Sequence, residues 1–296
     1  MSETETQRKY ETIDATLIEE GAVLRLLLDH PKGNILSMKM LGEIEQALAE
    51  HRDLPALRLV LLRGTGGHFS FGASVAEHKK ELAPKMLSTF HRVVREIAKY
   101  PVPIAAVVEG RCLGGALEVV LVCHLLFAAS NAIFACPEIK LGVFPPVLAV
   151  AGPCRLSASA SERLVLTGDE IDAATGSMLG LVTSVIEAGK DAEGAVLEWY
   201  RNKLAPLSAF AIRQATLASR DGSALLTALG APLDAAEKRY VDKLLPSHDA
   251  NEGIAAFMER RPPSGRTSSA PARRTEPRVP TFVPSGTTTA TRMEEK

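Results

Sequence analysis

Hydrophobic and polar positions near the start of the chain change from a strand period to a helical period. Residues 12–18 and 22–28 are rich in β-formers and flank Glu19-Glu20-Gly21, which predicts a β-hairpin. A helix is expected from Ser37, a suitable N-cap, because apolar residues recur at helical spacing after it. Those apolar positions are Leu41, Ile44 and Leu48. The hairpin and the helix together indicate a mixed fold.

The following segments continue this alternation of strands and helices. Residues 57–63 form a short run rich in Leu and Val, which predicts a buried parallel strand. Residues 87–97 have a helical period that ends before Pro101. Residues 104–108 predict the next strand, and Gly114 begins another helix. This alternation predicts an α/β fold in which helices pack outside parallel strands.

The pattern becomes helical only in the last third of the chain. Residues 206–219, 224–245 and 250–260 have the period of helices and contain few strand formers. We therefore divide the chain into an α/β core over residues 1–205 and a helical region over residues 206–261. The helical region is expected to cap the core or to serve in oligomerisation.

Residues 262–296 differ in composition from everything before them. They hold six of the 18 prolines, many Ser, Thr and Arg residues, and almost no apolar periodicity. Such a composition predicts a disordered tail. Its arginines are expected to be solvated, and contact with an anionic partner is the alternative.

Composition and charge narrow the classes of function. The chain has 296 residues, of which 46% are hydrophobic, and a formal net charge of -1 at pH 7. These values are typical of a globular protein. A nearly neutral chain lacks the basic surface that non-specific nucleic-acid binding requires, so no nucleic-acid partner is expected. The composition therefore favours small-molecule chemistry.

The cysteines and the apolar runs indicate the compartment. The four cysteines lie in apolar surroundings with no CxxC pair and no Cys/His spacing suited to zinc, so we expect reduced thiols and no metal site. The first ten residues are polar and charged rather than a secretory signal, and the longest apolar run, residues 119–129, is too short to span a bilayer. The sequence therefore predicts a cytoplasmic protein with no membrane partner. The cysteines are Cys112, Cys123, Cys136 and Cys154.

The first candidate for chemistry is the junction around Gly114-Gly115. A strand is expected to turn into a helix there, so N–H groups without intrahelical partners face a site that favours negative charge. Such a site is suited to a developing oxyanion. Glu118 follows Gly115 by about one helical turn, so its carboxylate can reach the same space. Glu118 could instead complement the helix dipole, but the helix is apolar all round, and a buried carboxylate needs a reason.

A second acid, Glu138, follows an apolar segment, residues 133–135, at the expected mouth of a strand. Catalytic groups of α/β folds concentrate at such ends. The alternative is an ordinary surface-loop carboxylate. Two carboxylates beside one oxyanion site suit the addition of water to an activated double bond, because one activates water while the other delivers a proton to carbon.

A second source of backbone amides is the segment His68–Ser74, which follows the strand expected at residues 57–63. The small residues Gly72 and Ala73 let the backbone approach a ligand closely. The segment is not a phosphate-binding P-loop, because no Gly-Lys-Ser/Thr follows.

Taken together, residues 12–261 resemble the crotonase (enoyl-CoA hydratase/isomerase) superfamily. Residues 69–73 are similar to its first oxyanion loop, residues 112–118 to its second, and residues 134–139 to the segment that carries its second glutamate. The resemblance implies a crotonase-like spiral of ββα units followed by C-terminal helices. It also implies assembly as a homotrimer or a dimer of trimers.

The resemblance further implies a coenzyme A thioester substrate and no separate cofactor. The thioester oxygen would lie between the N–H groups of Ala73 and Gly115, Glu118 would position water, and Glu138 would exchange the proton at carbon. The family's hydratases keep both glutamates, so hydration of an enoyl or dienoyl thioester is favoured. A double-bond isomerase or decarboxylase and a non-catalytic scaffolding paralogue remain alternatives. The residues expected to bind the substrate or its CoA moiety are Lys32, Gly33, Ile35, Ala73, Ser74, Val75, Gly114, Gly115, Pro137 and Val143.

Departures from the family pattern bear on the substrate. Ser74 and His124 each stand where the family frequently has Asp, and Ala116 stands where a third Gly is frequent. Residues 143–146, Val-Phe-Pro-Pro, replace a glycine-rich continuation, which predicts a stiffer and bulkier pocket wall. Within the family, these segments are most similar to the cyclohexa-1,5-diene-1-carbonyl-CoA hydratases.

Overall fold

The computed structural model of the chain describes residues 8–264. Nearly all of the predicted tail therefore lies outside the described residues. The predicted hairpin is confirmed: β2 (Ile13–Ile18) and β3 (Val23–Leu28) pair antiparallel. The turn between them uses positive φ angles of 51°, 56° and 84° at residues 19–21. A short strand, β1 (Arg8–Lys9), pairs antiparallel with β2.

The main sheet has seven strands in the order β1-β2-β3-β4-β5-β7-β10. From β3 onward its strands are parallel, as the alternation predicted, and only the β1-β2-β3 edge is antiparallel. The strands after the hairpin are β4 (Leu59–Gly64), β5 (Ile104–Val108), β7 (Leu125–Ala129) and β10 (Ser184–Ile186).

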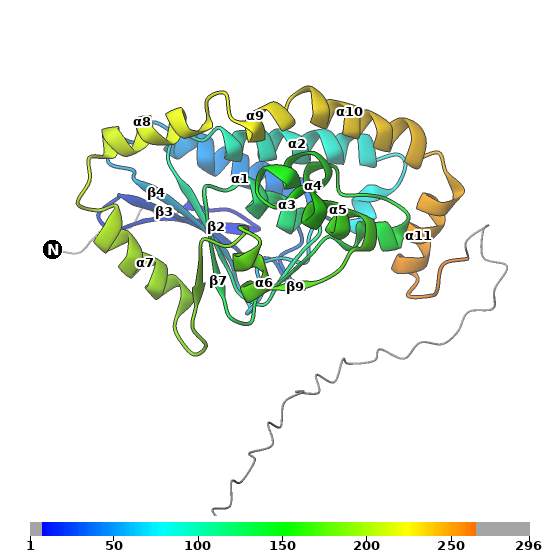
Figure 1. Cartoon of the computed structure of the whole chain (residues 1–296), viewed down its shortest axis with the longest axis horizontal. Helices are drawn as coiled ribbons and strands as arrows, with labels where there is room; N and C mark the ends of the chain where they lie inside the picture. The colour runs from blue at the N-terminus through cyan, green and yellow to red at the C-terminus, as the bar shows by residue number, and fades with distance from the viewer. Residues whose placement is uncertain (1–7, 265–296) are drawn as a thin grey trace, which may run out of the picture. The chain divides into compact units, whose positions relative to one another are not determined.

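Helices cover both faces of this sheet (Figure 1). On one face, α1 (Met38–His51), α2 (Ala83–Ala98) and the wholly buried α3 (Gly115–Val122) contribute to the larger apolar core. On the other face, α7 (Ala192–Lys203) packs its buried Val196 and Tyr200 into a second apolar core with β3, β4 and β5. The expected N-cap is confirmed, because the Ser37 hydroxyl accepts the Met40 N–H at 3.2 Å.

A second sheet of three short strands positions the candidate site. Its members are β6 (Arg111–Leu113), β8 (Ile133–Ala135) and β9 (Ile171–Asp172), in the order β6-β8-β9. β6 leads directly into α3, and β8 leads into a 3-10 helix over Pro137–Leu141. Because β6 and β8 are parallel neighbours, Glu118 and Glu138 emerge from adjacent strand ends.

Helices alone form the part of the described chain that follows β10. They are α7, α8 (Ala209–Arg220), α9 (Ala224–Ala228), α10 (Ala231–Arg239), a π-helix (Tyr240–Leu244) and α11 (His248–Met258). The prediction of one helix over residues 224–245 was wrong, because α9 ends before Gly230 and a new helix, α10, begins at Ala231 with Pro232 in its first turn. Proline lacks the N–H that a continuing helix needs. In Figure 1, α8, α9 and α10 run along the layer of α1 and α2.

Three further helices lie between β8 and β10 along the chain. They are α4 (Pro146–Ala151), α5 (Ala158–Thr167) and α6 (Ala173–Met178). Within residues 8–264, no helix is long and apolar enough to cross a bilayer.

Candidate active site

The first free amide of the site belongs to Ala73. Leu36 forms an isolated parallel bridge with Ala73, in which the Leu36 N–H donates to the Gly72 carbonyl at 2.9 Å and the Ser74 N–H donates to the Leu36 carbonyl at 3.4 Å. The peptide groups of the bridged residue itself point away from the partner strand. The Ala73 N–H consequently faces the opposite side and donates to no described residue.

The second free amide belongs to Gly115, the first residue of α3. Gly114 turns the chain with φ 55° and ψ −130°, and its N–H donates to the Ala135 carbonyl at 2.7 Å. The Gly115 N–H is in the first turn of the helix and finds no acceptor among residues 8–264.

These two amides belong to closely packed stretches of backbone. A side chain on Gly115 would place its Cβ 3.3 Å from the Ala73 Cβ, and one on Gly72 would place its Cβ 2.4 Å from the Leu113 carbonyl oxygen. Gly72 also has φ +94°, which favours glycine. Glycine at these positions lets the two loops approach each other, and Ala73 and Gly115 are neighbours at the point of approach.

Glu118 lies on α3 and is 4% exposed. Its Oε1 accepts the N–H groups of Val147 at 2.7 Å and Leu148 at 2.9 Å. Burial raises the pKa of Glu118 above its usual range, and these two amides and the neighbouring His91 oppose that rise. The amides therefore fix the carboxylate and favour its charged form.

Glu138 enters the site from the 3-10 helix that follows β8. Its Oε1 lies against Gly114, where a Cβ would stand only 2.6 Å away, and its buried Oε2 has no hydrogen-bond partner among the described residues. Burial, and then the nearby Glu118, raise the pKa of Glu138 to about 8. The two acids thus share one desolvated space, but only Glu118 receives backbone donors from another segment of the chain.

The acids border two adjoining cavities. The smaller cavity, about 20 Å³, is lined by Ala73, Gly115, Glu118 and Glu138, and its volume suits one water molecule. The larger cavity, about 620 Å³, shares Ala73 and Glu138 with the smaller one. Its apolar wall comes from Phe71, Val75, Leu113, Leu141, Val143, Ile254 and Phe257.

The predicted substrate-binding residues divide into two groups. Ala73, Val75, Gly114, Pro137 and Val143 line the larger cavity, and Gly115 lines the smaller one. The remaining four, Lys32, Gly33, Ile35 and Ser74, line neither.

Gly33 supports the larger cavity indirectly. Its carbonyl accepts the Phe71 N–H at 2.9 Å, and a Cβ on Gly33 would overlap the Phe71 ring. Two basic residues that the sequence did not single out, Lys140 and Arg261, also line this cavity.

Sequence reasoning missed two residues that line the smaller cavity, His91 and Tyr240, and the partner of His91, Glu237. His91 on α2 is fully buried, with Nδ1 2.6 Å from Glu237 Oε2 and an Nε2 that has no described partner. The hydroxyl of Tyr240 is buried and likewise has no partner in the described part of the chain. His91 occupies an apolar face, and Glu237 and Tyr240 are distant in the sequence, so no local pattern connects them with Glu118.

A sequence profile described as Enoyl-CoA hydratase/isomerase matches residues 19–266 of the chain. The chain is 44% identical over 245 residues to a cyclohexa-1,5-dienecarbonyl-CoA hydratase from Thauera aromatica, an alignment that covers 83% of this chain and 93% of the relative. It is 32% identical over 256 residues to a probable mitochondrial enoyl-CoA hydratase 2 from Arabidopsis thaliana, covering 82% and 81% of the two chains.

Among solved structures, the fold is similar to an enoyl-CoA hydratase from Mycobacterium avium subsp. paratuberculosis. The TM-score is 0.74 at 28% identity, and the match covers 87% of this chain and 99% of the other. The expected crotonase-like α/β fold with C-terminal helices is confirmed by this likeness.

Proposed function

The chain belongs to the enoyl-CoA hydratase/isomerase family, and we propose that Glu118, Glu138 and the amides of Ala73 and Gly115 form its hydratase site. The enzyme is a hydro-lyase of the enoyl-CoA hydratase type, which adds water to the double bond of an α,β-unsaturated CoA thioester or removes it. The observation that carries the site assignment is the water-sized cavity that both buried carboxylates and both loops border.

The two amides would hold the thioester carbonyl oxygen. Attack of water on a conjugated double bond places enolate-like charge on that oxygen. Fixed donors aimed at the developing charge lower a barrier by about 3 kcal/mol each. The bridge at Leu36 and the glycines at 72 and 114 hold these donors in place before substrate arrives.

The different environments of the two acids assign them different proton transfers. Glu118, whose Oε1 is held by two backbone amides, serves as the carboxylate that orients water and takes its proton. Glu138 has no such donors, and its raised pKa of about 8 keeps it protonated at neutral pH, ready to protonate the α-carbon. The water oxygen bonds to the β-carbon as Glu138 protonates the α-carbon. A proton then passes from Glu118 to Glu138 and restores the starting state.

The buried His91–Glu237 pair would position this water. His91 Nδ1 is held by Glu237, which leaves Nε2 free at the cavity that Glu118 borders. His91→Gln is expected to change the pH profile of hydration, whereas a purely structural role would lower only stability.

For the acyl group, we propose cyclohexa-1,5-diene-1-carbonyl-CoA. The support is the 44% identity to a relative that bears this activity in its name, and a reaction cavity whose wall is largely apolar. Phe144 lines the smaller cavity, with its ring 5.7 Å from that of Tyr240. An alicyclic diene carries no polar group that such a wall would leave unsatisfied.

The test is turnover against three thioesters: the cyclic diene, crotonyl-CoA and a branched glutaconyl-type thioester. Hydration is followed by loss of the conjugated absorbance and by mass of the product. Fastest hydration of the cyclic diene is expected. Isomerised or decarboxylated product without added water would contradict the proposed site chemistry, and a preference for crotonyl-CoA would contradict only the acyl group.

The proposal also includes the division of the chain into a core and a helical region after residue 205, and the assembly of the chain as an oligomer. Tyr240 of the helical region lines the smaller cavity, which supports a capping role for residues 206–261. We propose a homotrimer or a dimer of trimers, and light scattering of the full chain measures its mass directly.

A further inference from the structure

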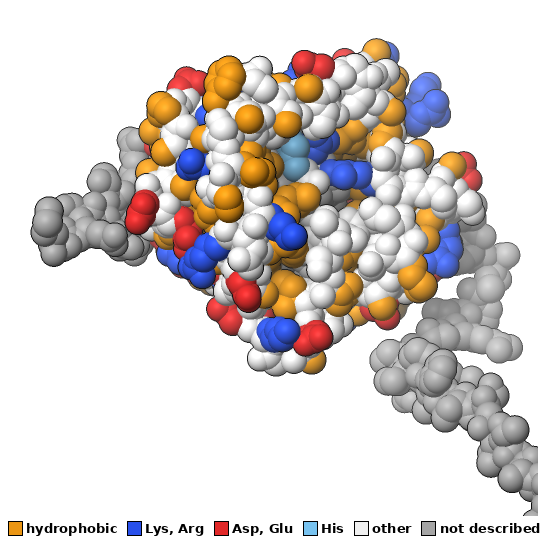
Figure 2. Space-filling model, turned by 60° about the vertical axis from the view of Figure 1, so that its left-hand side comes forward, with side chains coloured by type: hydrophobic (Ala, Val, Ile, Leu, Met, Phe, Trp, Pro, Cys, Tyr) orange, Lys and Arg blue, Asp and Glu red, His pale blue; other side chains and the backbone are white. Residues whose placement is uncertain are grey.

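A third cavity, of about 820 Å³, lies away from the active site. It is bordered by α7, α8, α9 and the start of β7, and it shares no lining residue with the two cavities that contain the glutamates. Figure 2 shows a hollow on this side of the protein, with a histidine and basic side chains visible in it.

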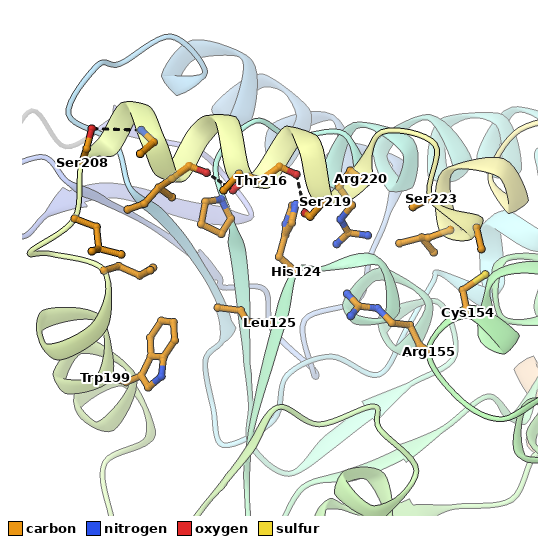
Figure 3. A pocket seen from close by; sticks show the side chains of 18 residues that line it. His124, Leu125, Cys154, Arg155, Trp199, Ser208, Thr216, Ser219, Arg220 and Ser223 are labelled. Atoms are coloured by element: carbon orange, nitrogen blue, oxygen red, sulfur yellow. Dashed lines mark hydrogen bonds between the residues drawn. The ribbon is translucent and has the colours of Figure 1, made fainter.

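One end of this cavity is basic. Figure 3 shows the imidazole of His124 and the guanidinium groups of Arg155 and Arg220 gathered there, with Trp199 toward the other end. No Asp or Glu from residues 8–264 is among its lining residues. The buried Arg220 and the half-buried Arg155 thus lie near each other without a carboxylate, an arrangement that an anion would stabilise.

Capping of α3 accounts for part of the arginine contacts. Arg155 Nε donates to the Leu121 carbonyl at 3.1 Å and its Nη2 donates to the Cys123 carbonyl, while Arg220 Nη2 donates to the Val122 carbonyl at 3.0 Å. Cations at a helix C-terminus are favourable. Arg155 Nη1 and the Nε and Nη1 of Arg220 donate to none of the described residues, so donors remain that capping does not use.

His124 supplies another donor to the same end. Its Nδ1 accepts the Ile104 N–H at 3.0 Å, so the ring proton is on Nε2, which is buried and has no partner within the described chain. Burial, followed by the charges of Arg220 and Arg155, lowers the pKa of His124 to about 3, so the ring is neutral. Burial and the charge of Arg155 also lower the pKa of Arg220 to about 10. Burial is the larger cause of both shifts, and the charges of the arginines add to it.

The other end of the cavity is apolar and includes an aromatic ring. The apolar lining residues of the cavity are Leu125, Trp199, Leu204, Leu207, Ile212 and Leu225, and Trp199 lies at the end away from Arg155 (Figure 3). The Trp199 ring packs against Phe127 with a centroid separation of 5.2 Å, which fixes its orientation. A ligand that fills both ends must carry a negative head and an apolar body.

We propose that this cavity binds an organic carboxylate whose anionic head contacts Arg155, Arg220 and His124 and whose alicyclic or aromatic body lies toward Trp199. Guanidinium groups match the planar geometry of a carboxylate. His124 stands where the resemblance to the family leads one to expect Asp, so the anion that such a side chain would supply must come from outside the chain. This inference does not depend on the reaction proposed for Glu118 and Glu138.

Trp199 is the chain's one tryptophan, so its fluorescence reports on this cavity alone. The full-length protein is titrated with cyclohexanecarboxylate, and with cyclohexanecarboxamide and inorganic phosphate at equal ionic strength. A saturable fluorescence change is expected for the carboxylate, with affinity at least about tenfold weaker for both the amide and phosphate. An equal response to the amide, or no response to the carboxylate, would overturn the proposal. So would phosphate binding as tightly as the carboxylate, because the apolar end would then contribute nothing.

The matched variants are His124→Asp and His124→Asn. His124→Asp supplies an internal carboxylate and is expected to weaken carboxylate binding at least about tenfold, whereas the neutral His124→Asn retains more of it. Circular dichroism and hydratase turnover check that both variants are folded. Unchanged binding by His124→Asp would overturn the proposal, as would a fluorescence response that appears only after the oligomer is dissociated, because a second copy would then cover the cavity.

Discussion

The active site and the Trp199 cavity are opposites in charge. The first holds two acids beside two free amides, and the second holds the buried Arg220, the half-buried Arg155 and a histidine donor. In each, burial and then a nearby group of the same kind shift a pKa toward the neutral form: the pKa of Glu138 is raised and the pKa of Arg220 is lowered. Pairing the acids with the arginines would have neutralised both regions, but the fold keeps them apart.

The comparison indicates that polar groups without a partner inside the protein mark a site for a reaction or a ligand. In the active site, the protonated acid and the free amides are complementary to a reaction that creates charge. At the Trp199 cavity, the free donors are complementary to a charge that is already present on a ligand. The predictions below separate these two roles, beginning with the largest expected effect.

The largest effect is expected from removing an acid of the active site. Glu138→Gln keeps the shape of the side chain but cannot deliver a proton, and Glu118→Gln cannot accept one, so each is expected to lower kcat by about 10²–10⁴-fold. Steady-state hydration measures the loss. His124→Asp is the control from the other region and keeps full turnover; equal losses in all three variants would show that the two regions are not separate.

Gly72→Ala is expected to lower kcat by about 10²-fold, because its Cβ would stand 2.4 Å from the Leu113 carbonyl and would displace the loop that carries the Ala73 amide. Gly66→Ala is a matched control: Gly66 has φ +71°, but a Cβ there meets nothing within 4 Å. Both variants bear backbone strain, but only one moves the oxyanion site. Similar kcat values for the two would contradict the role of the amide.

The pH dependence of hydration and of stability tests the role of Glu138. Hydration is expected to fall as pH rises through about 8, because Glu138 then loses the proton that it delivers. Since its folded pKa is raised from 4.5, the folded protein holds this proton more tightly than the unfolded chain, and that stability is lost as pH rises from 4.5 to about 8.

Glu138→Gln has no such proton. The Tm of this variant should therefore rise relative to the Tm of the wild type as the pH increases from 4.5 to about 8. Thermal melts at several pH values measure the difference. A constant difference in Tm would show that the carboxyl is not buried as an acid.

The smallest effect is expected at the Trp199 cavity. Without added ligand, His124→Asp should raise Tm by about 2 °C relative to His124→Asn, because the new carboxylate pairs with the arginines. Differential scanning calorimetry compares the two. A lower Tm for the Asp variant would mean that the arginines are already neutralised.

Much of the fold was predictable because its signals are local. The turn at Glu19-Glu20-Gly21, the Ser37 cap and the glycines before α3 each act through neighbouring residues. The strands β6 and β9 have three and two residues, too few for a period to show. The break at Gly230 was missed because the apolar period continues across it.

The site was predictable only in part, for the same reason. Glu118 and Gly115 share a helix, so their proximity follows from helical geometry. The donation of the Val147 and Leu148 amides to Glu118, and the approach of His91 and Tyr240, depend on tertiary packing. The meeting of Arg155 with Arg220 is likewise a product of the fold, although the substitution at His124 gave one signal that the local charge had changed.

The most direct test of the central claim is a crystal structure of the full-length enzyme with a saturated, non-hydratable CoA thioester. The account predicts the thioester oxygen about 2.7–3.1 Å from the Ala73 and Gly115 nitrogens, with its α- and β-carbons beside Glu138 and Glu118. A thioester bound with its carbonyl directed to solvent, or seated in the Trp199 cavity, would contradict the claim.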